Sequence, residues 1–197
     1  MKVDVIETGT ANMASVMAGL RRAGAEPRVT TDPDDEGIVV LPGVGAFGAG
    51  MERLVELGLV DRLRKRLLEG RPTLAVCLGL QLLAEASEES PGVTGLSVLP
   101  ARVERFKTPS IIPQLGWNRV WPETSELVEE GYAYYANSYR LAAIPEGWRG
   151  ALSQHGETFV AALEREQVLA CQFHPELSGA WGQALLERWL DRVKGAA

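Results

Sequence analysis

Three side chains that together can attack a carbonyl group stand at the ends of apolar segments in this chain. Cys77 ends the apolar run TLAVC and precedes the leucine-rich pattern LGLQLLAE. His174 follows the apolar run VLACQF, and Glu176 lies two residues further on. A thiolate is an effective nucleophile when an imidazole serves as its base and a carboxylate orients that imidazole. These residue types and spacings predict covalent thiol chemistry on an acyl group.

The position of Cys77 favours a sharp turn at the carboxyl end of a strand, where open α/β folds bind their ligands. Such nucleophile turns need small residues two before and two after the nucleophile, and Ala75 and Gly79 occupy those positions. A helix beginning beneath the sulfur would favour the thiolate. Most free cysteines are buried core residues, so this stretch alone leaves a structural role for Cys77 equally open.

The choice of a base for Cys77 is narrow because the chain has two histidines. His174 can reach Cys77 if both strands end at the same edge of a sheet. In extended backbone Glu176 points to the same side as His174, and Pro175 restricts the segment between them. A solvated strand end is the simpler alternative for His174. His155 lies in the turn-like segment SQHGET, and we interpret it as a polar turn residue.

A metal site is the rival interpretation of Cys171 and His174. Residues three apart on a strand point to opposite faces, and the other ligands of a zinc set are missing. We therefore expect no metal and no cofactor, and we interpret Cys171 as a core residue of its strand.

The oxyanion that forms when a thiolate attacks an acyl group needs backbone N–H donors. The Leu78 amide directly follows the nucleophile, and the glycine-rich segment PGVGAFG, residues 42–48, offers a backbone that can approach closely. This segment matches neither a dinucleotide fingerprint nor a P-loop. Gln81, one helical turn beyond Cys77, would face the same pocket and hold a polar substrate. The simpler alternative for Gln81 is an exposed helix residue.

The elements that must position these residues follow the order of a doubly wound α/β sheet. Strands are expected at VDVI, PRVTT, GIVVLPGVG, TLAVC and VLACQF. Helices are expected from Met13 to Leu20, over Met51–Glu69, after Cys77 and over 180–194, the last with Trp181, Leu185, Trp189 and Val193 on one face. Between Leu96 and Arg165, the runs ARVERF, GWNRVW, YAYYANSY and TFVAALER predict an antiparallel extension.

Composition and charge limit the classes of function. The chain has 197 residues, of which 46% are hydrophobic, and we expect residues 1–197 to form one domain. Apolar runs are too short to cross a membrane, the N-terminus lacks a signal-peptide core, and two cysteines make no disulfide framework. We therefore expect a cytoplasmic protein. A net charge of −6 without a basic block argues against nucleic acid as the main partner. The acidic turns DPDDEG and EASEESPG are interpreted as solvated, without function.

Three segments, PGVGAFG, CLGLQLL and QFHPE, resemble in their order and separations the class I glutamine amidotransferases. This resemblance implies a flavodoxin-like α/β fold with a central, mostly parallel sheet, and hydrolysis of the glutamine side-chain amide by a Cys–His–Glu triad. Within the class, IPQLGWN at 112–118, YANSYR at 135–140 and FVAALERE near residue 160 are similar to the glutaminase subunits of imidazole glycerol phosphate synthase. The resemblance covers essentially the whole chain.

The resemblance implies a role for each matching position. Cys77 would form a glutamyl thioester, His174 would act as general base and acid, and Glu176 would orient His174. The backbone amides of Val44 and Leu78 would form the oxyanion hole. The residues that would hold glutamine are Gly45, Gln81, Ser138 and Tyr139. Those near the docking face for a (β/α)8-barrel synthase subunit, which would receive ammonia within a heterodimer, are Asn12, Trp117 and Tyr134.

Five residues in four segments depart from the usual family pattern. They are Ala75 in place of Gly, Asn137 in place of the His of a His-Ser-Tyr segment, Leu177 in place of Lys, and Glu7-Thr8 in place of Asp-Tyr before Gly9. Two other functions stay open. One is the glutaminase of another amidotransferase, such as pyridoxal 5'-phosphate synthase, in which GWN and NSY have no place. The other is a non-catalytic α/β scaffold, against which the presence of Cys77, His174 and Glu176 argues.

Overall fold

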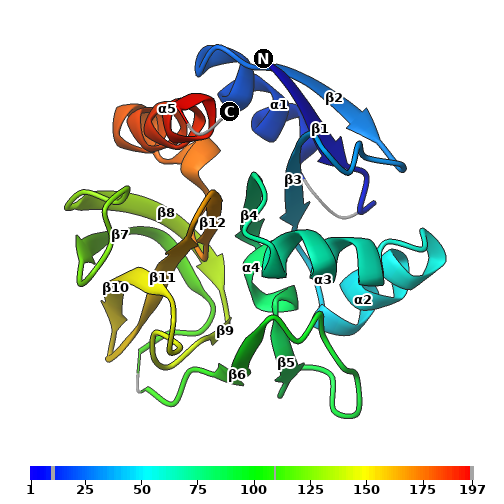
Figure 1. Cartoon of the computed structure of the whole chain (residues 1–197). Coiled ribbons are helices and arrows are strands. Elements are labelled where there is room, and N and C mark those ends of the chain that lie inside the picture. The colour runs from blue at the N-terminus through cyan, green and yellow to red at the C-terminus, as the bar shows by residue number, and fades with distance from the viewer. Residues whose placement is uncertain (10–11, 109, 196–197) are drawn as a thin grey trace.

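A nine-stranded sheet runs through the molecule in the computed structural model, which describes residues 1–9, 12–108 and 110–195 (Figure 1). Its parallel half contains, in spatial order, β2 (Glu26–Thr30), β1 (Lys2–Ile6), β3 (Ile38–Gly43), β4 (Thr73–Cys77) and β12 (Val168–Cys171). Its antiparallel half continues with β11 (Glu157–Arg165), β10 (Arg149–His155), β7 (Gln114–Pro122) and β8 (Gly131–Asn137). A parallel sheet with an antiparallel extension confirms the predicted fold class.

Three further strands form a small sheet beside the main one. They are β5 (Ala84–Ser87), β6 (Leu99–Arg105) and β9 (Tyr139–Arg140), with β6 in the middle. Because β9 follows β8 after a single residue, this small sheet fixes the course of the chain around Ser138.

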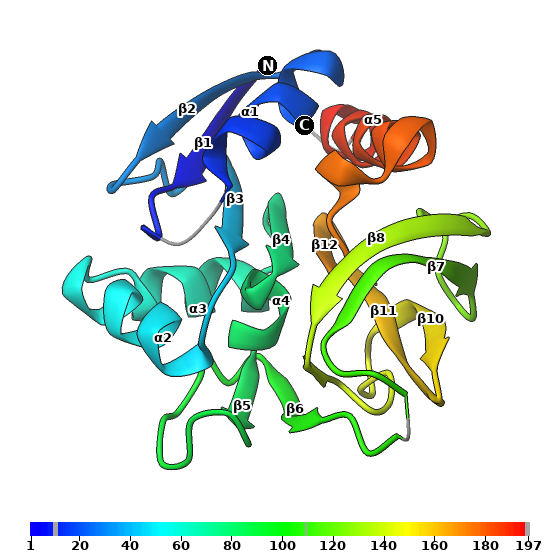
Figure 2. The same ribbon diagram turned by 180° about the vertical axis from the view of Figure 1, so that it is seen from behind.

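Helices cover both faces of the parallel strands (Figures 1 and 2). On one face α1 (Met13–Arg22) and α5 (Gly179–Gly195) share a core with Val40 and Val76. On the other face α2 (Phe47–Glu56), α3 (Val60–Leu68) and the short α4 (Leu78–Leu82) share a core with Leu41 and Ala75. Successive strand residues therefore enter opposite cores, which explains why IVVL and TLAVC are continuously apolar.

The single helix predicted over Met51–Glu69 is wrong. The segment forms α2 and α3, separated by a turn in which Gly58 has φ +66°. The Gly58 and Leu59 amides donate to the carbonyls of Val55 and Leu54, so the turn satisfies the last carbonyl groups of α2.

The helix predicted after Cys77 is shorter than its leucine pattern indicates. It ends at Leu82, and Ala84–Ser87 then pairs in parallel with β6. Pairing with a distant strand overrides the local helical spacing, as tertiary contacts commonly do. The segment SQHGET is also misread as turn alone, since β10 extends to His155.

The two acidic turns have structural partners, although Asp32, Asp34, Asp35 and Glu36 of the first turn are exposed, as predicted. Glu89 accepts a hydrogen bond from the Phe47 amide at 2.7 Å, and Ser90 accepts one from the Gly48 amide at 2.9 Å. The segment EASEESPG therefore caps the start of α2. In the other turn, Asp32 and Asp35 both pair with Arg62 on α3.

Candidate active site

Cys77 occupies a sharp corner between β4 and α4. Its backbone has φ +55° and ψ −106°, a conformation that residues other than glycine rarely adopt. A Cβ atom on Gly79 would lie 2.1 Å from the Leu41 carbonyl oxygen, so only glycine fits there. Ala75 is fully buried among the α2–α4 core residues, where its methyl group is accommodated. This corner has the geometry of a nucleophile turn.

His174 lies at the same edge of the sheet as Cys77, because β12 and β4 are parallel neighbours with Cys171 paired to Val76. Its Nδ1 atom lies 2.9 Å from Oε1 of Glu176, and both side chains are buried. Pro175 and Glu176 belong to a short 3-10 turn, η1 (Pro175–Leu177), so the extended backbone predicted between His174 and Glu176 is wrong. The tight turn nevertheless brings carboxylate and imidazole together.

The pKa of His174 is raised above its ordinary value. Burial alone would lower it, but hydrogen bonds to the Cys77 sulfur and to Glu176 stabilise the imidazolium and outweigh burial. Cys171 differs, since complete burial in β12 raises the pKa of its thiol and keeps it neutral. Cys171 packs in the core, as predicted.

The backbone of His174 is clamped to strand β8. Its amide donates to the Tyr134 carbonyl at 2.9 Å. The buried Ser178 hydroxyl donates to the His174 carbonyl at 2.6 Å and accepts from the Tyr134 amide at 3.0 Å. Helix α1 closes the other side, where a Cβ atom on Gly19 would lie 2.9 Å from Cβ of Glu176. These contacts fix the imidazole relative to the sulfur.

A cavity of about 340 Å³ opens beside the Cys77 sulfur. The structure places around it all six residues predicted to bind substrate or oxyanion, namely Val44, Gly45, Leu78, Gln81, Ser138 and Tyr139. Gly45 has φ +99°, which gives the segment after β3 a backbone path that other residues disfavour. Glu89 also lines the cavity. Sequence reasoning missed it because the acidic turn was interpreted as solvated.

Side-chain amides form a hydrogen-bonded chain behind this cavity. Gln81 is buried, contrary to the exposed alternative, and donates to the Tyr139 carbonyl at 3.1 Å and to Oε1 of Gln172 at 3.0 Å. Asn137 donates to the same Tyr139 carbonyl at 3.0 Å. Gln114 donates to Asn137 at 3.3 Å. The Asn137 carboxamide therefore has a structural role, because its nitrogen donates one hydrogen bond and its oxygen accepts another.

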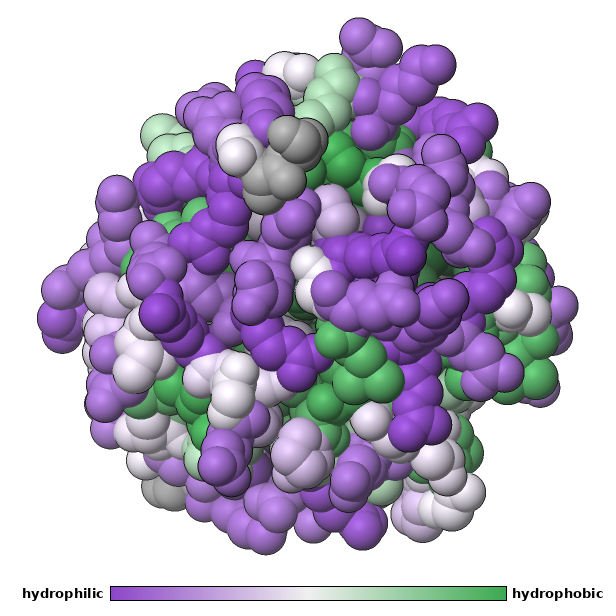
Figure 3. All heavy atoms as spheres, viewed as in Figure 1, coloured by the Kyte–Doolittle hydropathy of each residue, from purple (hydrophilic) through white to green (hydrophobic). Residues whose placement is uncertain are grey.

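Two of the three residues predicted to face a partner, Trp117 and Tyr134, lie side by side in the fold. Trp117 on β7 stands opposite Tyr134 on β8, with ring centroids 6.3 Å apart in an edge-to-face contact. Leu115 and Tyr132 on the same strands are 71% and 61% exposed. Asn12 instead caps α1 by accepting from the Ser15 amide at 3.3 Å. The face seen in Figure 3 is mostly hydrophilic, with smaller hydrophobic areas. Exposed apolar and aromatic side chains that gather on one strand pair are typical of an interaction surface.

Residues 5–193 match the family model for class-I glutamine amidotransferases, and the chain belongs to this family and is a glutamine amidotransferase. It is 37% identical to the "Imidazole glycerol phosphate synthase subunit HisH" of Methanothermobacter thermautotrophicus, over 98% of this chain and 99% of the relative. The HisH subunit of Escherichia coli K12 is also 37% identical, over 97% of this chain and 100% of the relative.

Two solved structures share the fold. A crystal structure of a glutamine amidotransferase superposes with a TM-score of 0.73 at 22% identity, over 98% of both chains. The PurLQS structure from Thermotoga maritima gives a TM-score of 0.72 at 15% identity, over 99% of this chain and 98% of that chain.

In the described part of the chain, no helix is long and apolar enough to cross a bilayer.

Proposed function

We propose that this chain is the glutaminase subunit of an imidazole glycerol phosphate synthase, with Cys77, His174 and Glu176 as its catalytic triad. The observation that carries the proposal is a strained cysteine at the same sheet edge as a buried His–Glu pair, at the wall of a cavity that fits an amino acid. The full-length similarity to HisH subunits supports the choice among amidotransferases.

The geometry supports a two-step hydrolysis of the glutamine side-chain amide. The Cys77 thiolate attacks the amide carbon, and the His174 imidazolium gives its proton to the nitrogen that leaves as ammonia when the C–N bond breaks. A glutamyl thioester remains on Cys77. His174, now neutral, removes a proton from water, which attacks the thioester carbon. The C–S bond breaks, and glutamate leaves with the thiolate restored.

The groups around the cavity take complementary roles in this proposal. The Val44 and Leu78 amides would meet the oxyanion in each step. Ser138 and Tyr139 would hold the glutamine backbone together with Gly45. Gln81 uses both Nε2 protons on protein acceptors, so its Oε1 atom is the one that would face the substrate ammonium.

Docking of a (β/α)8-barrel synthase subunit fits the exposed faces of β7 and β8. Trp117, Tyr134, Leu115 and Tyr132 present aromatic and apolar surface there, which is typical of the centre of an interface. Asn12 at the start of α1 would lie at the margin of that heterodimer contact. Ammonia would then pass directly to the barrel. We include a cytoplasmic location and a single domain over residues 1–197 in the proposal. The two cysteines, Cys77 and Cys171, are both free, as is usual in a reducing compartment.

Glutamate release from glutamine tests the proposal. The purified chain is measured alone, with the barrel subunit, and with that subunit's ribonucleotide ligand added. We expect a low rate alone because Gly43–Gly45 can rotate a peptide and remove one oxyanion donor, which costs roughly 10²–10³ in rate. We expect the rate to rise with partner and ligand and to vanish in Cys77→Ala. No release in any mixture would favour a different amidotransferase partner or the scaffold alternative.

A further inference from the structure

Gln172 is a completely buried side chain that touches the nucleophile and that the hydrolysis above does not use. Its Nε2 atom lies 3.8 Å from the Cys77 sulfur, within hydrogen-bond distance for a sulfur acceptor. Its Oε1 atom accepts a hydrogen bond from Gln81 at 3.0 Å. The amide is therefore held at both ends and has one orientation, with its N–H directed at sulfur.

The backbone and the neighbours of Gln172 make this orientation rigid. Its own amide donates to the Ala161 carbonyl of β11 at 2.8 Å, which fixes the start of the side chain. Gln81, which fixes the other end, also holds the Tyr139 carbonyl at 3.1 Å. Two side chains therefore connect the sulfur to the strand segment that lines the substrate cavity beside Ser138.

We propose that Gln172 is a positioning residue that holds the Cys77 sulfur toward the cavity and, through Gln81, sets its place relative to the segment 137–139. This inference rests on the proposed glutaminase function and adds to it a residue outside the triad.

The chemistry favours this role over simple core packing. An amide N–H donated to a thiolate is a charge-assisted hydrogen bond, stronger than one donated to a neutral thiol. It therefore favours the reactive form of Cys77 at the start of each turnover and at its end. The Gln172 amide is thus a donor held against the sulfur of a residue whose backbone is already strained. An apolar side chain in place of Gln172 would fill the space and supply neither donor nor acceptor.

The test compares Gln172→Met, which keeps the length of the side chain without its amide, with Gln172→Glu, which keeps the acceptor for Gln81 but replaces the donor to sulfur. Both are assayed as the complex with the barrel subunit and its ligand. A charge-assisted hydrogen bond is worth about 10- to 100-fold in rate. We therefore expect kcat for glutamate release to fall by about that factor in Gln172→Met and further in Gln172→Glu, with KM for glutamine changed less than kcat.

Alkylation of Cys77 by iodoacetamide, located by mass spectrometry, separates positioning from mere packing. Its rate should fall in parallel with kcat in both variants, because the reagent reads the thiolate without needing the glutamine site. Gln154→Leu is the matched control, since the Gln154 side chain is exposed on β10 and should leave both rates unchanged. Thermal unfolding of each variant checks that it folds, and Gln172→Glu stays informative if Gln172→Met does not fold.

The possible outcomes distinguish this inference from the proposed function. If the folded Gln172 variants have the same kcat and the same alkylation rate as the wild type, the positioning role is overturned and the glutaminase proposal stays intact. A fall in kcat without a fall in alkylation would also overturn it. A wild-type complex that neither releases glutamate nor alkylates at Cys77 would overturn the proposed function and this inference with it.

Discussion

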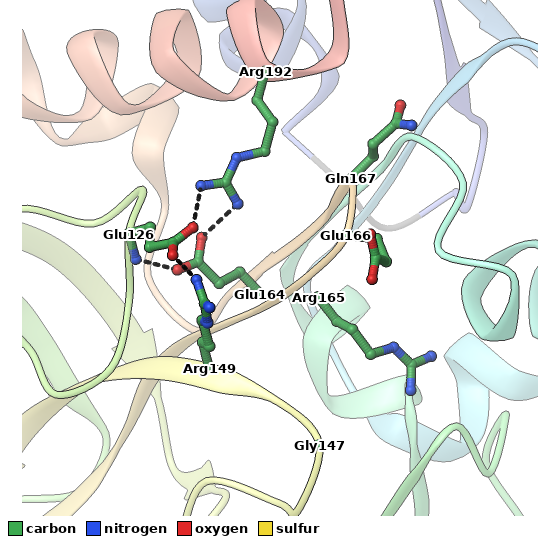
Figure 4. A pocket seen from close by; sticks show the side chains of 8 residues that line it. All are labelled: Glu126, Gly147, Arg149, Glu164, Arg165, Glu166, Gln167 and Arg192. Atoms are coloured by element: carbon green, nitrogen blue, oxygen red, sulfur yellow. Dashed lines mark hydrogen bonds and ion pairs between the residues drawn. The ribbon is translucent and has the colours of Figure 1, made fainter. Parts of the chain in front are cut away.

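Two cavities at opposite ends of the parallel strands show how differently polar groups are used in this molecule. One lies beside Cys77 at the carboxyl end of β4. The other, about 460 Å³ and lined by Arg165, Glu166 and Gln167 among others, lies at the amino end of β12, where Val168 pairs with Thr73 (Figure 4). The second cavity has many more charges, and charge alone would make it the more attractive site.

Four of the six charged side chains around the second cavity, Glu126, Arg149, Glu164 and Arg192, are engaged with one another. Glu164 is 2% exposed and accepts from the amides of Glu126 and Leu127 and from Arg192. Glu126 also pairs with Arg149 and Arg192 (Figure 4). The cavity beside Cys77 instead presents a thiol, backbone amides and a hydroxyl. The comparison teaches that mutually neutralised charges stabilise a fold, whereas reactivity depends on oriented groups that are left for a substrate.

Cys77→Ala, in the cavity beside β4, should cause the largest loss of glutamate release of the substitutions proposed. Without the nucleophile, glutamate release should fall by roughly 10⁵-fold or more, as for removal of other covalent nucleophiles. The fold should be retained, because the substitution removes one buried atom. Steady-state release of glutamate and a thermal melt measure the two effects. Residual activity near that of the wild type would show that hydrolysis does not proceed through Cys77.

Gly79→Ala tests the sharp corner that presents the sulfur. Its Cβ atom would lie 2.1 Å from the Leu41 carbonyl oxygen, so the backbone of Cys77 must shift. A displacement of about 1 Å commonly costs 10²-fold in rate, and the melting temperature should fall as well. Gly92→Ala, at a turn glycine with open space around it but also with positive φ, is the matched control and should affect stability alone.

Ser178→Ala removes the hydroxyl that bridges His174 and Tyr134. We expect a loss of about 1–3 kcal/mol in the free energy of unfolding, because two buried backbone groups lose a partner. The rate of glutamate release should fall by about 10-fold, since the imidazole is less well fixed. Denaturant unfolding and kinetics measure both effects. A stability loss with an unchanged rate would limit Ser178 to a purely structural role.

The pKa of His174, measured in the wild type and in Cys77→Ala, tests whether His174 and Cys77 interact. Because hydrogen bonding to Cys77 and Glu176 outweighs burial, His174 should stay protonated to a more alkaline pH than an ordinary histidine. In Cys77→Ala the pKa should fall, since the largest raising contribution is removed. Imidazole NMR resonances can follow this pKa in the wild type and in the variant. A lower pKa of His174 in the variant supports a Cys–His pair, and an unchanged pKa contradicts it.

Glu164→Gln should have the smallest effect on activity. It weakens the ion pair with Arg192 at the opposite end of the sheet, and we expect about 1–3 kcal/mol less stability because buried amides and a guanidinium lose a charged acceptor. Glutamate release per folded molecule should stay at the wild-type level. A large loss of activity in a folded variant would mean that the second cavity takes part in function.

The sequence by itself determined the residue types of the site and much of the local structure. The β4 and α1 segments lie where apolar periodicity places them, and Gly79 is dictated by the turn that Cys77 requires. These features depend on interactions within a few residues, which a pattern can reveal. The break at Gly58 escaped prediction because leucines on both sides of it keep helical spacing.

Only the tertiary structure decided which distant groups meet. The pairing of β12 with β4 brings His174 to Cys77, and the same pairing places Gln172 between the sulfur and Gln81. Glu89 likewise reaches the cavity because its turn folds back onto α2. Strand order and side-chain hydrogen bonds depend on contacts between residues far apart in the chain. Local patterns carry little information about those contacts. His174 could therefore be named as a candidate base for the nucleophile, but the contacts of Gln172 and Glu89 could not be predicted.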